Sequence, residues 1–146
     1  MPKGPTPSNR SGGLCPAKSA CVAYVDCPCP ITIERGHLTP DGVLDLHAKS
    51  DFGRVLEAMT TTYARLATRR TLLLVVGDAR NNRRPPRADL LRRLREQVQR
   101  VVWLVPEPQV RWNTGDSVLD RYAPACDLVV ECQTLGALLS AVRATL

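Results

Sequence analysis

The sequence predicts an α/β domain whose sheet is mostly parallel and is covered by helices on both faces. Three segments, each with a continuous apolar centre, carry this prediction: "TLLLVV" at 71–76, "VVWLV" at 101–105 and "CDLVVEC" at 126–132. Between and after them, apolar residues recur at the i, i+3, i+4 spacing of an amphipathic helix. Continuous apolar strands that alternate with such helices are typical of parallel sheets buried on both faces.

The first half of the chain gives weaker signals. A short buried strand is expected at "ACVAYVD", residues 20–26, ending on Asp26. Residues 27–50 are expected to be irregular because of their prolines and glycines, although a short strand at "GVLDLH" is possible. A helix should then begin after Ser50 or Asp51, either of which can cap it. Its apolar stripe comprises Phe52, Val55, Leu56, Met59, Tyr63 and Leu66.

The second half repeats the strand–helix alternation more clearly. The stripe of the next helix is Leu90, Leu91, Leu94 and Val98, and that of the last is Leu135, Leu138, Leu139, Val142 and Leu146. Between these two helices, a short helical turn is expected after Asp116, using Val118, Leu119 and Tyr122. The strand ends near 77, 105 and 131 suit right-handed crossovers. Trp103 lies within a predicted strand and should belong to the core.

The chain is predicted to comprise a leader and one domain. Residues 1–19 are rich in Pro, Gly and Ser and are expected to be disordered. Residues 20–146 are expected to form that domain. No signal peptide or membrane-length apolar run is evident. The six cysteines lack metal-site spacing, which favours free thiols in a reducing cytoplasm.

Polar side chains follow the predicted strands where ligands bind in such folds. In open parallel sheets, ligands lie beyond the carboxyl ends of the strands. Asp78 follows the run at 71–76 directly, and Asp26 follows the run at 20–25. The residues after Asp78 are Arg80, Asn81 and Asn82, which could orient it, contact a partner or simply form a tight turn.

The net positive charge and the absence of common catalytic motifs limit the classes of function that the sequence supports. The net charge is +6, and eight arginines fall between Arg80 and Arg100. This run could attract nucleic acid, but it contains no aromatic residue for stacking on single strands, and a solvated helix face explains it equally well. No Gly-x-x-x-x-Gly-Lys-Ser/Thr, Gly-x-Gly-x-x-Gly or Gly-x-Ser-x-Gly motif occurs. The sequence therefore favours a non-enzymatic protein.

Three segments resemble the von Willebrand factor A (VWA) domains of the CoxE-like group. They are "SDFGRVLEAM", "LLLVVGDARNNRRPPRADLL" and "VVWLVPEPQVRWNTGDSVLDRYAPACDLVVECQTLGALL". The resemblance covers about residues 50–146 and, more faintly, "AYVD" at 23–26. It implies a Rossmann-like sheet with a metal-ion-dependent adhesion site at its carboxyl edge.

The metal site that the resemblance implies is incomplete here. Ser50 matches the hydroxyl ligand of the family's second loop, and Asp78 matches the carboxylate of its third loop. The implied cation is Mg²⁺, which prefers oxygen ligands. However, the Asp-x-Ser-x-Ser motif of the first loop is absent.

The resemblance therefore implies a domain truncated at its N-terminal side, without the central strand that lies between 20–25 and 71–76. Direct pairing of "CVAYV" with "LLLVV" is the simplest expectation; a strand supplied by another polypeptide and an unstable product are the alternatives.

The functional expectation is a protein-interaction module in the cytoplasm. Relatives of this group associate with MoxR-type AAA+ ATPases, so the resemblance implies an adaptor that works with such an ATPase in assembly or maturation. The expected partner-binding residues are Arg80, Asn81, Asn82, Trp112 and Asp116. Two alternatives are a basic nucleic-acid-binding domain using the Arg80–Arg100 run and a truncated gene product without a function.

Overall fold

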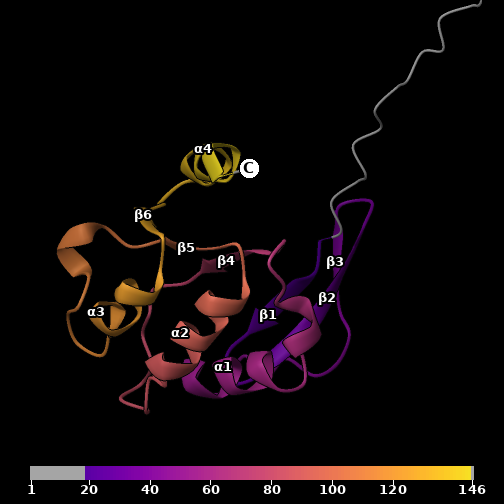
Figure 1. Cartoon of the computed structure of the whole chain (residues 1–146), viewed down its shortest axis with the longest axis horizontal. Coiled ribbons are helices and arrows are strands. Elements are labelled where there is room, and N and C mark those ends of the chain that lie inside the picture. Colours follow the sequence, from indigo (N-terminus) through magenta and orange to yellow (C-terminus); the bar gives the residue numbers. More distant parts are fainter. Residues whose placement is uncertain (1–18, 146) are drawn as a thin grey trace, which may run out of the picture.

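The computed structural model describes residues 19–145, which form two three-stranded sheets, helices and short 3₁₀ turns (Figure 1). The predicted leader lies outside these residues except for Ser19. Within the described part of the chain, no helix has the length and apolar character needed to cross a membrane.

The parallel sheet confirms the three later strand predictions. It consists of β4 (Leu72–Val76), β5 (Arg100–Val105) and β6 (Leu128–Glu131), in the order β4-β5-β6. Both pairs of neighbours run parallel, with Leu74 beside Val102 and Leu104 beside Val130. The five residues Val101–Val105 of the central strand are completely buried. An apolar run without alternation is what burial on both faces requires.

Helices cover both faces of this sheet, as predicted (Figure 1). One face packs against α1 (Phe52–Thr60), α2 (Ala88–Gln97) and α3 (Leu119–Tyr122). The other face packs against α4 (Leu135–Thr145) alone. The 3₁₀ turns are η1 (Ala64–Leu66), η2 (Gln109–Arg111) and η3 (Ala123–Ala125).

The helix-covered core is built around Trp103. Its ring stacks on Tyr122 at a centroid distance of 5.0 Å and meets Phe52 edge-on at 5.2 Å. Offset and edge-to-face pairs of this kind are favoured beyond the area they bury. The indole N–H donates to the backbone oxygen of Gly77 at 2.8 Å, so the buried ring leaves no polar atom unsatisfied. The prediction that Trp103 is a core residue is confirmed.

The first helix begins where the sequence indicated but ends earlier. The Asp51 side chain accepts a hydrogen bond from the Arg54 N–H at 3.2 Å, and Asp51 is therefore the N-cap. The helix ends at Thr60. Thr60 and Thr61 direct their hydroxyls back to the carbonyls of Leu56 and Glu57, which competes with the helix ladder. Tyr63 and Leu66 consequently lie in and beside η1 rather than on the helix.

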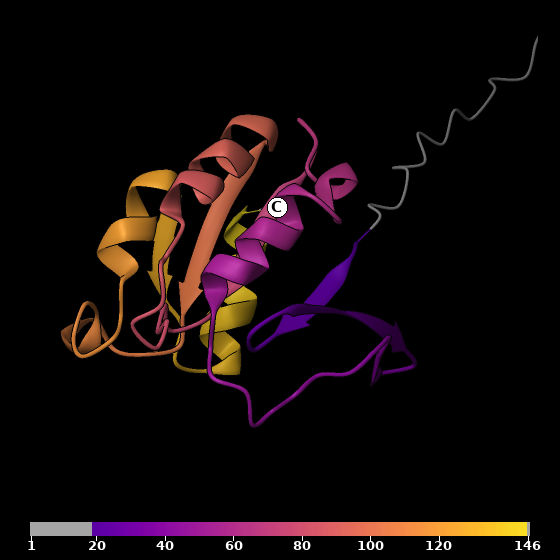
Figure 2. The ribbon, with the colours of Figure 1, turned by 90° about the horizontal axis from the view of Figure 1, so that it is seen from below.

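The amino-terminal part differs from the prediction. Residues 27–50 are not all irregular, because β2 (Pro28–Glu34) and β3 (His37–Pro40) form an antiparallel sheet with β1 (Cys21–Tyr24), in the order β1-β2-β3. The expected direct pairing of 21–25 with β4 is wrong. The link from Tyr24 to Pro28 is short enough for a hairpin, and hairpin pairing is antiparallel. Figure 2 shows this sheet as a separate layer beside the parallel one. The possible strand at 42–47 does not form.

The turn between β2 and β3 and the prolines in β2 explain why the sequence did not predict these two strands. Arg35 and Gly36 join them with positive φ angles of 49° and 81°, as a tight hairpin requires. Pro28 and Pro30 lie within a central strand, where a missing N–H normally disrupts the ladder. The Pro30 carbonyl faces the β3 side, because it accepts from the Asp41 N–H at 2.8 Å. The missing N–H groups of both prolines therefore point away from β1, and the ladder between β1 and β2 loses no hydrogen bond.

Candidate functional site

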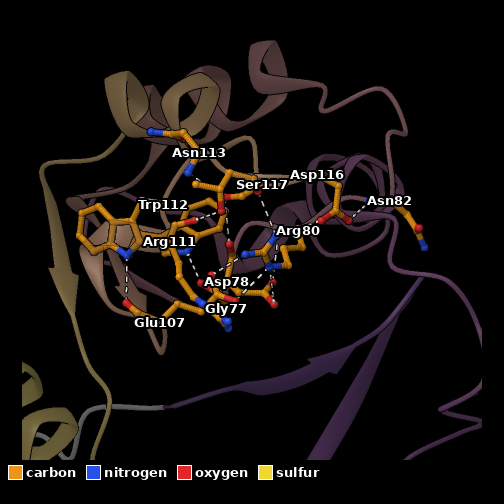
Figure 3. A network of polar contacts seen from close by, with 12 residues as sticks. Gly77, Asp78, Arg80, Asn82, Glu107, Arg111, Trp112, Asn113, Asp116 and Ser117 are labelled. Carbon is orange, nitrogen blue, oxygen red and sulfur yellow. Dashed lines mark hydrogen bonds and ion pairs between the residues drawn. The ribbon is translucent and has the colours of Figure 1, made fainter.

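The loops that follow β4 and β5 come together at the carboxyl edge of the parallel sheet. The first is 77–82, the second is 106–117, and Figure 3 shows their polar side chains converging. An isolated antiparallel bridge joins Arg80 to Ser117. The Val118 N–H donates to the Ala79 oxygen at 3.0 Å, and the Asn81 N–H donates to the Asp116 oxygen at 3.3 Å. The two loops are therefore fastened to each other along their backbones.

Arg80 is the hub of the edge (Figure 3). Its Nε and Nη2 donate to the two carboxylate oxygens of Glu107 at 3.0 and 2.9 Å. Its Nη1 donates to the Thr114 oxygen at 3.0 Å and to Asp116 Oδ1 at 3.1 Å. A two-pronged guanidinium–carboxylate pair is both stronger and more directional than a single ion pair. Arg80 thus fixes the loop after β5 relative to the loop after β4.

These hydrogen bonds change the acid–base behaviour of the cluster. Hydrogen bonds to Glu107 and then to Asp116 raise the pKa of Arg80, which stays charged. The hydrogen bond from Arg80 lowers the pKa of the Asp116 carboxyl below its ordinary value, with a further contribution from the Asn82 N–H. That N–H donates to Asp116 Oδ2 at 3.2 Å. The charged side chains of Arg80, Glu107 and Asp116 therefore hold one another in place at this edge.

Asp78 sits at the tip of β4 with its carboxylate partly exposed. Its Oδ1 accepts from the Arg80 N–H at 3.0 Å, which makes a local turn of the Asx type. The next residue, Ala79, has a φ angle of 58°, a conformation that residues with a Cβ seldom adopt. The Ser117 hydroxyl donates to the Asp78 backbone oxygen at 3.3 Å. The side chain of Asp78 keeps 44% of its surface exposed.

Asn81 has an internal role that sequence analysis did not identify. It is completely buried. Its Oδ1 accepts from the Phe52 N–H at 2.7 Å, and its Nδ2 donates to the Arg84 oxygen at 2.9 Å. It therefore satisfies an N–H in the first turn of α1 that has no partner inside the helix. Both the oxygen and the nitrogen of the amide are hydrogen-bonded, and the side chain does not reach the surface.

The remaining predicted partner-binding residues lie at or near the surface of the same edge. Asn82 is exposed, and Trp112 is half-buried with its indole N–H donating to the Glu107 oxygen at 3.0 Å. Beside Trp112, Val110 is 84% exposed. The structure thus brings Asp78, Asn82, Trp112 and Asp116 to one edge.

An open depression of about 390 Å³ places Ser50 and Asp78 together. Its wall also includes Tyr24 from β1 and Pro106 after β5. Burial raises the pKa of Tyr24 to about 12, and the nearby Asp78 carboxylate adds to the shift. Tyr24 and Glu107 are components of this edge that the sequence did not single out. The only available signal for Tyr24 was its position near the end of a predicted strand.

The donors in this depression do not fit a resident Mg²⁺ ion. Ser50 and Asp78 offer one hydroxyl and one carboxylate, and that carboxylate already accepts from the Arg80 N–H. Among residues 19–145, no three His, Cys, Asp or Glu side chains cluster as a metal site. A divalent cation held by oxygen ligands needs more donors and more negative charge than this pair provides.

The arginine run does not form one uninterrupted basic stripe. Four of its members contact carboxylates: Arg80 as described, Arg84 with Asp51, Arg87 with Glu57 and Asp89, and Arg95 with Asp127. Only the Arg80 and Arg95 contacts are as short as hydrogen bonds, the latter at 2.6 Å. A substantial part of the charge in this run is therefore balanced within the domain.

The fold and its edge define a Rossmann-like α/β domain that presents braced polar loops at the carboxyl ends of its parallel strands. Residues 38–141 match the family model "VWA domain containing CoxE-like protein". This chain therefore belongs to the CoxE-like VWA family, whose domains in general serve protein interaction. No curated protein and no solved structure gives a significant match.

Proposed function

We propose that this protein is a non-enzymatic interaction module whose carboxyl-edge loops bind a protein partner, and that this partner is a MoxR-type AAA+ ATPase engaged in assembly or maturation of other complexes. The observation that supports the proposal is the Arg80 hub. It holds two loops rigidly through four short hydrogen bonds. Loops fixed before binding lose less conformational entropy when a partner docks.

The exposed part of this edge has the character of an interaction surface. Val110 and the half-buried Trp112 offer apolar area, while Asp78 and the exposed Asn82, Arg83 and Arg111 surround it with polar groups. Tryptophan and arginine are enriched where interfaces derive most of their binding energy. In this proposal Trp112 supplies the apolar anchor and Asp78 supplies a charged contact. Arg80, Asn81 and Asp116 hold the surface in shape.

A capture experiment tests the proposal directly. The immobilised chain is incubated with a purified MoxR-type AAA+ ATPase from the same genome, and the bound ATPase is quantified. Asp78→Ala and Trp112→Ala should each reduce the affinity by about tenfold or more, as is usual for central interface residues. The matched control is Glu96→Ala, because Glu96 is an exposed carboxylate in the last turn of α2, at the opposite edge of the sheet.

Two results would contradict the proposal. One is that the wild-type chain does not retain the ATPase. The other is that both edge variants retain it as well as the wild type and Glu96→Ala do. The first result argues against the partner, and the second argues against this edge as the binding surface.

A further inference from the structure

The outer side of β4 has no strand partner among the described residues. This strand pairs with β5 only. The Gly77 N–H donates to the Leu104 oxygen of β5 at 3.1 Å. Successive residues of a strand direct their backbone groups to opposite sides, so Leu73 and Val75 also face β5. Leu72, Leu74 and Val76 therefore direct their N–H and C=O groups outward. The Tyr24 hydroxyl confirms this direction, because it donates to the outward Val76 oxygen at 3.3 Å.

This edge lacks the features that normally keep an edge strand from pairing. Natural edges are protected by short length, charged residues, proline or bulges. The strand β3 is four residues long and ends at Pro40, and β6 is four residues long and ends at Glu131. By contrast, β4 reads Leu-Leu-Leu-Val-Val without any of these features. Its Val76 side chain is 51% exposed.

The space beside the carboxyl end of β4 is open. The 390 Å³ depression is lined on one side by Val76 and Gly77 and on the other by Val22 and Ala23 of β1. The link between the two strands here is the Tyr24 side chain rather than a backbone hydrogen bond. A side chain attached at Gly77 would collide with the Tyr24 hydroxyl, so this close contact depends on the glycine. An incoming strand has to displace this phenol group from Val76, and Val22 and Ala23 of β1 limit the room at this end of β4.

Charges at the two ends of β4 indicate which strand fits. Arg69 and Arg70 are exposed and precede the strand, while the partly exposed Asp78 follows it. Between them lie five apolar residues. A complementary strand is therefore apolar in its centre and carries an acidic residue at the end that lies beside the two arginines.

We propose that the outer edge of β4 binds an extended, apolar segment of a partner polypeptide by β-strand addition. The ligand forms backbone hydrogen bonds with Leu72, Leu74 and Val76, and its acidic end lies beside Arg69 and Arg70. Main-chain bonds provide affinity and alternate side chains provide specificity in this mode of recognition. The proposed strand site adjoins the edge loops, because Asp78 and the 390 Å³ depression belong to both, but it does not depend on the ATPase as partner.

Two other occupants fit the edge less well. Residues 1–18 contain prolines and glycines and no apolar run that matches β4. A second copy pairing through its own β4, antiparallel about Leu74, would place Asp78 opposite Arg70. However, β1 stands beside this edge in each copy, where the second sheet would have to lie. A single extended segment needs less room beside β1 than a second three-stranded sheet does.

The test uses two synthetic peptides, acetyl-Glu-Val-Ile-Val-Ile-Ser-amide and the reversed acetyl-Ser-Ile-Val-Ile-Val-Glu-amide, one for each strand direction. Binding is followed by amide chemical shifts and hydrogen exchange in NMR spectra of the full chain. One peptide should protect the amides of Leu72, Leu74 and Val76 and leave those of Leu73 and Val75, already bonded to β5, unchanged. Absence of binding by both peptides up to about 1 mM would overturn the proposal.

Peptide and protein variants show whether backbone bonds carry the binding. Two versions of the binding peptide are N-methylated at alternate residues. One should lose affinity about tenfold or more and the other should retain it, because only one set of N–H groups faces β4. Equal affinities of the two versions would contradict strand addition. In the protein, Leu74→Pro removes an outward N–H and should lower affinity by a similar factor, with circular dichroism verifying the fold.

Sedimentation of the chain without peptide tests the remaining occupant. A monomer supports the proposal. A concentration-dependent dimer that Leu74→Pro abolishes would show that a second copy occupies the edge and would overturn the proposal for a partner peptide. Failure here leaves ATPase capture by the loops unaffected, so the two proposals are judged independently.

Discussion

The two sheets of this protein illustrate two ways of forming strands. In the parallel sheet, β5 is completely buried from Val101 to Val105 and touches helices on both faces. In the antiparallel sheet, Cys29 is the one strand residue that is buried, and every residue of β3 is exposed. Burial of apolar surface is the main favourable term in folding. The comparison predicts that the parallel sheet contributes most of the stability and that the antiparallel sheet depends on it.

The largest expected effect is that of Trp103→Ala. The ring is fully buried and contacts Phe52 and Tyr122, so its loss should lower the free energy of unfolding by about 3–5 kcal/mol. Urea denaturation followed by circular dichroism measures this value. The matched control is Trp112→Ala, which removes a half-buried indole from the edge and should have a clearly smaller effect. Equal losses would contradict the central position of β5 in the core.

The next effect concerns the link between α1 and the edge. Asn81→Ala leaves the Phe52 N–H without its acceptor inside the protein and should reduce the free energy of unfolding by about 1–3 kcal/mol. The neighbouring Asn82→Gly changes an exposed side chain at a φ angle of 53°, which glycine adopts freely, and should change stability by less than about 0.5 kcal/mol. Thermal melting of the two variants compares them. A smaller loss for Asn81→Ala than for Asn82→Gly would refute the capping role.

Acid should weaken the ion pair between Asp116 and Arg80, which joins the two loops at the carboxyl edge of the sheet. Its carboxyl has a pKa below the ordinary value of 3.8 in the folded protein, chiefly because Arg80 donates to it. Its contribution to stability is therefore complete above the unfolded-state pKa and is lost as the pH falls below about 4 through the folded-state pKa. Asp116→Asn should flatten the dependence of unfolding free energy on pH in this range. An unchanged acid slope in this variant would argue against the ion-pair geometry.

The smallest effect is expected in the antiparallel sheet. Ile33 is 57% exposed on β2, and Ile33→Ser should change the free energy of unfolding by no more than about 0.5 kcal/mol. Chemical denaturation can detect a larger loss. A loss above about 2 kcal/mol would mean that this surface is buried in the folded protein, and the contrast between the sheets would then fail.

The same contrast explains which parts of the fold could be predicted. The strands β4, β5 and β6 could be located because each contains a continuous apolar run, and burial on both faces makes that pattern recognisable in the local sequence. The strand β2 contains Pro28 and Pro30 and little buried apolar surface, so neither alternation nor continuity identifies it. Its pairing depends on a turn at Arg35–Gly36 and on the direction in which the prolines face, which only the folded chain determines.

The candidate site was predictable to a similar extent. The rule that parallel strands end at a common edge placed Asp78 correctly beyond β4, and the resemblance to VWA domains paired it with Ser50, which lines the same depression. The internal role of Asn81 could not be foreseen. It depends on the Phe52 N–H, 29 positions away, lying within hydrogen-bond distance in the folded state. Sequence position indicates the edge, whereas tertiary contacts decide which of its side chains face inward.

Native-state hydrogen exchange measured residue by residue tests the central claim most directly. The amides of Val101–Val105 in β5 should exchange only through global unfolding, with the highest opening free energy in the molecule. The amides of β1, β2 and β3 should exchange through a local opening of clearly lower free energy. Equal opening free energies in the two sheets, or faster exchange in β5 than in β2, would contradict the account.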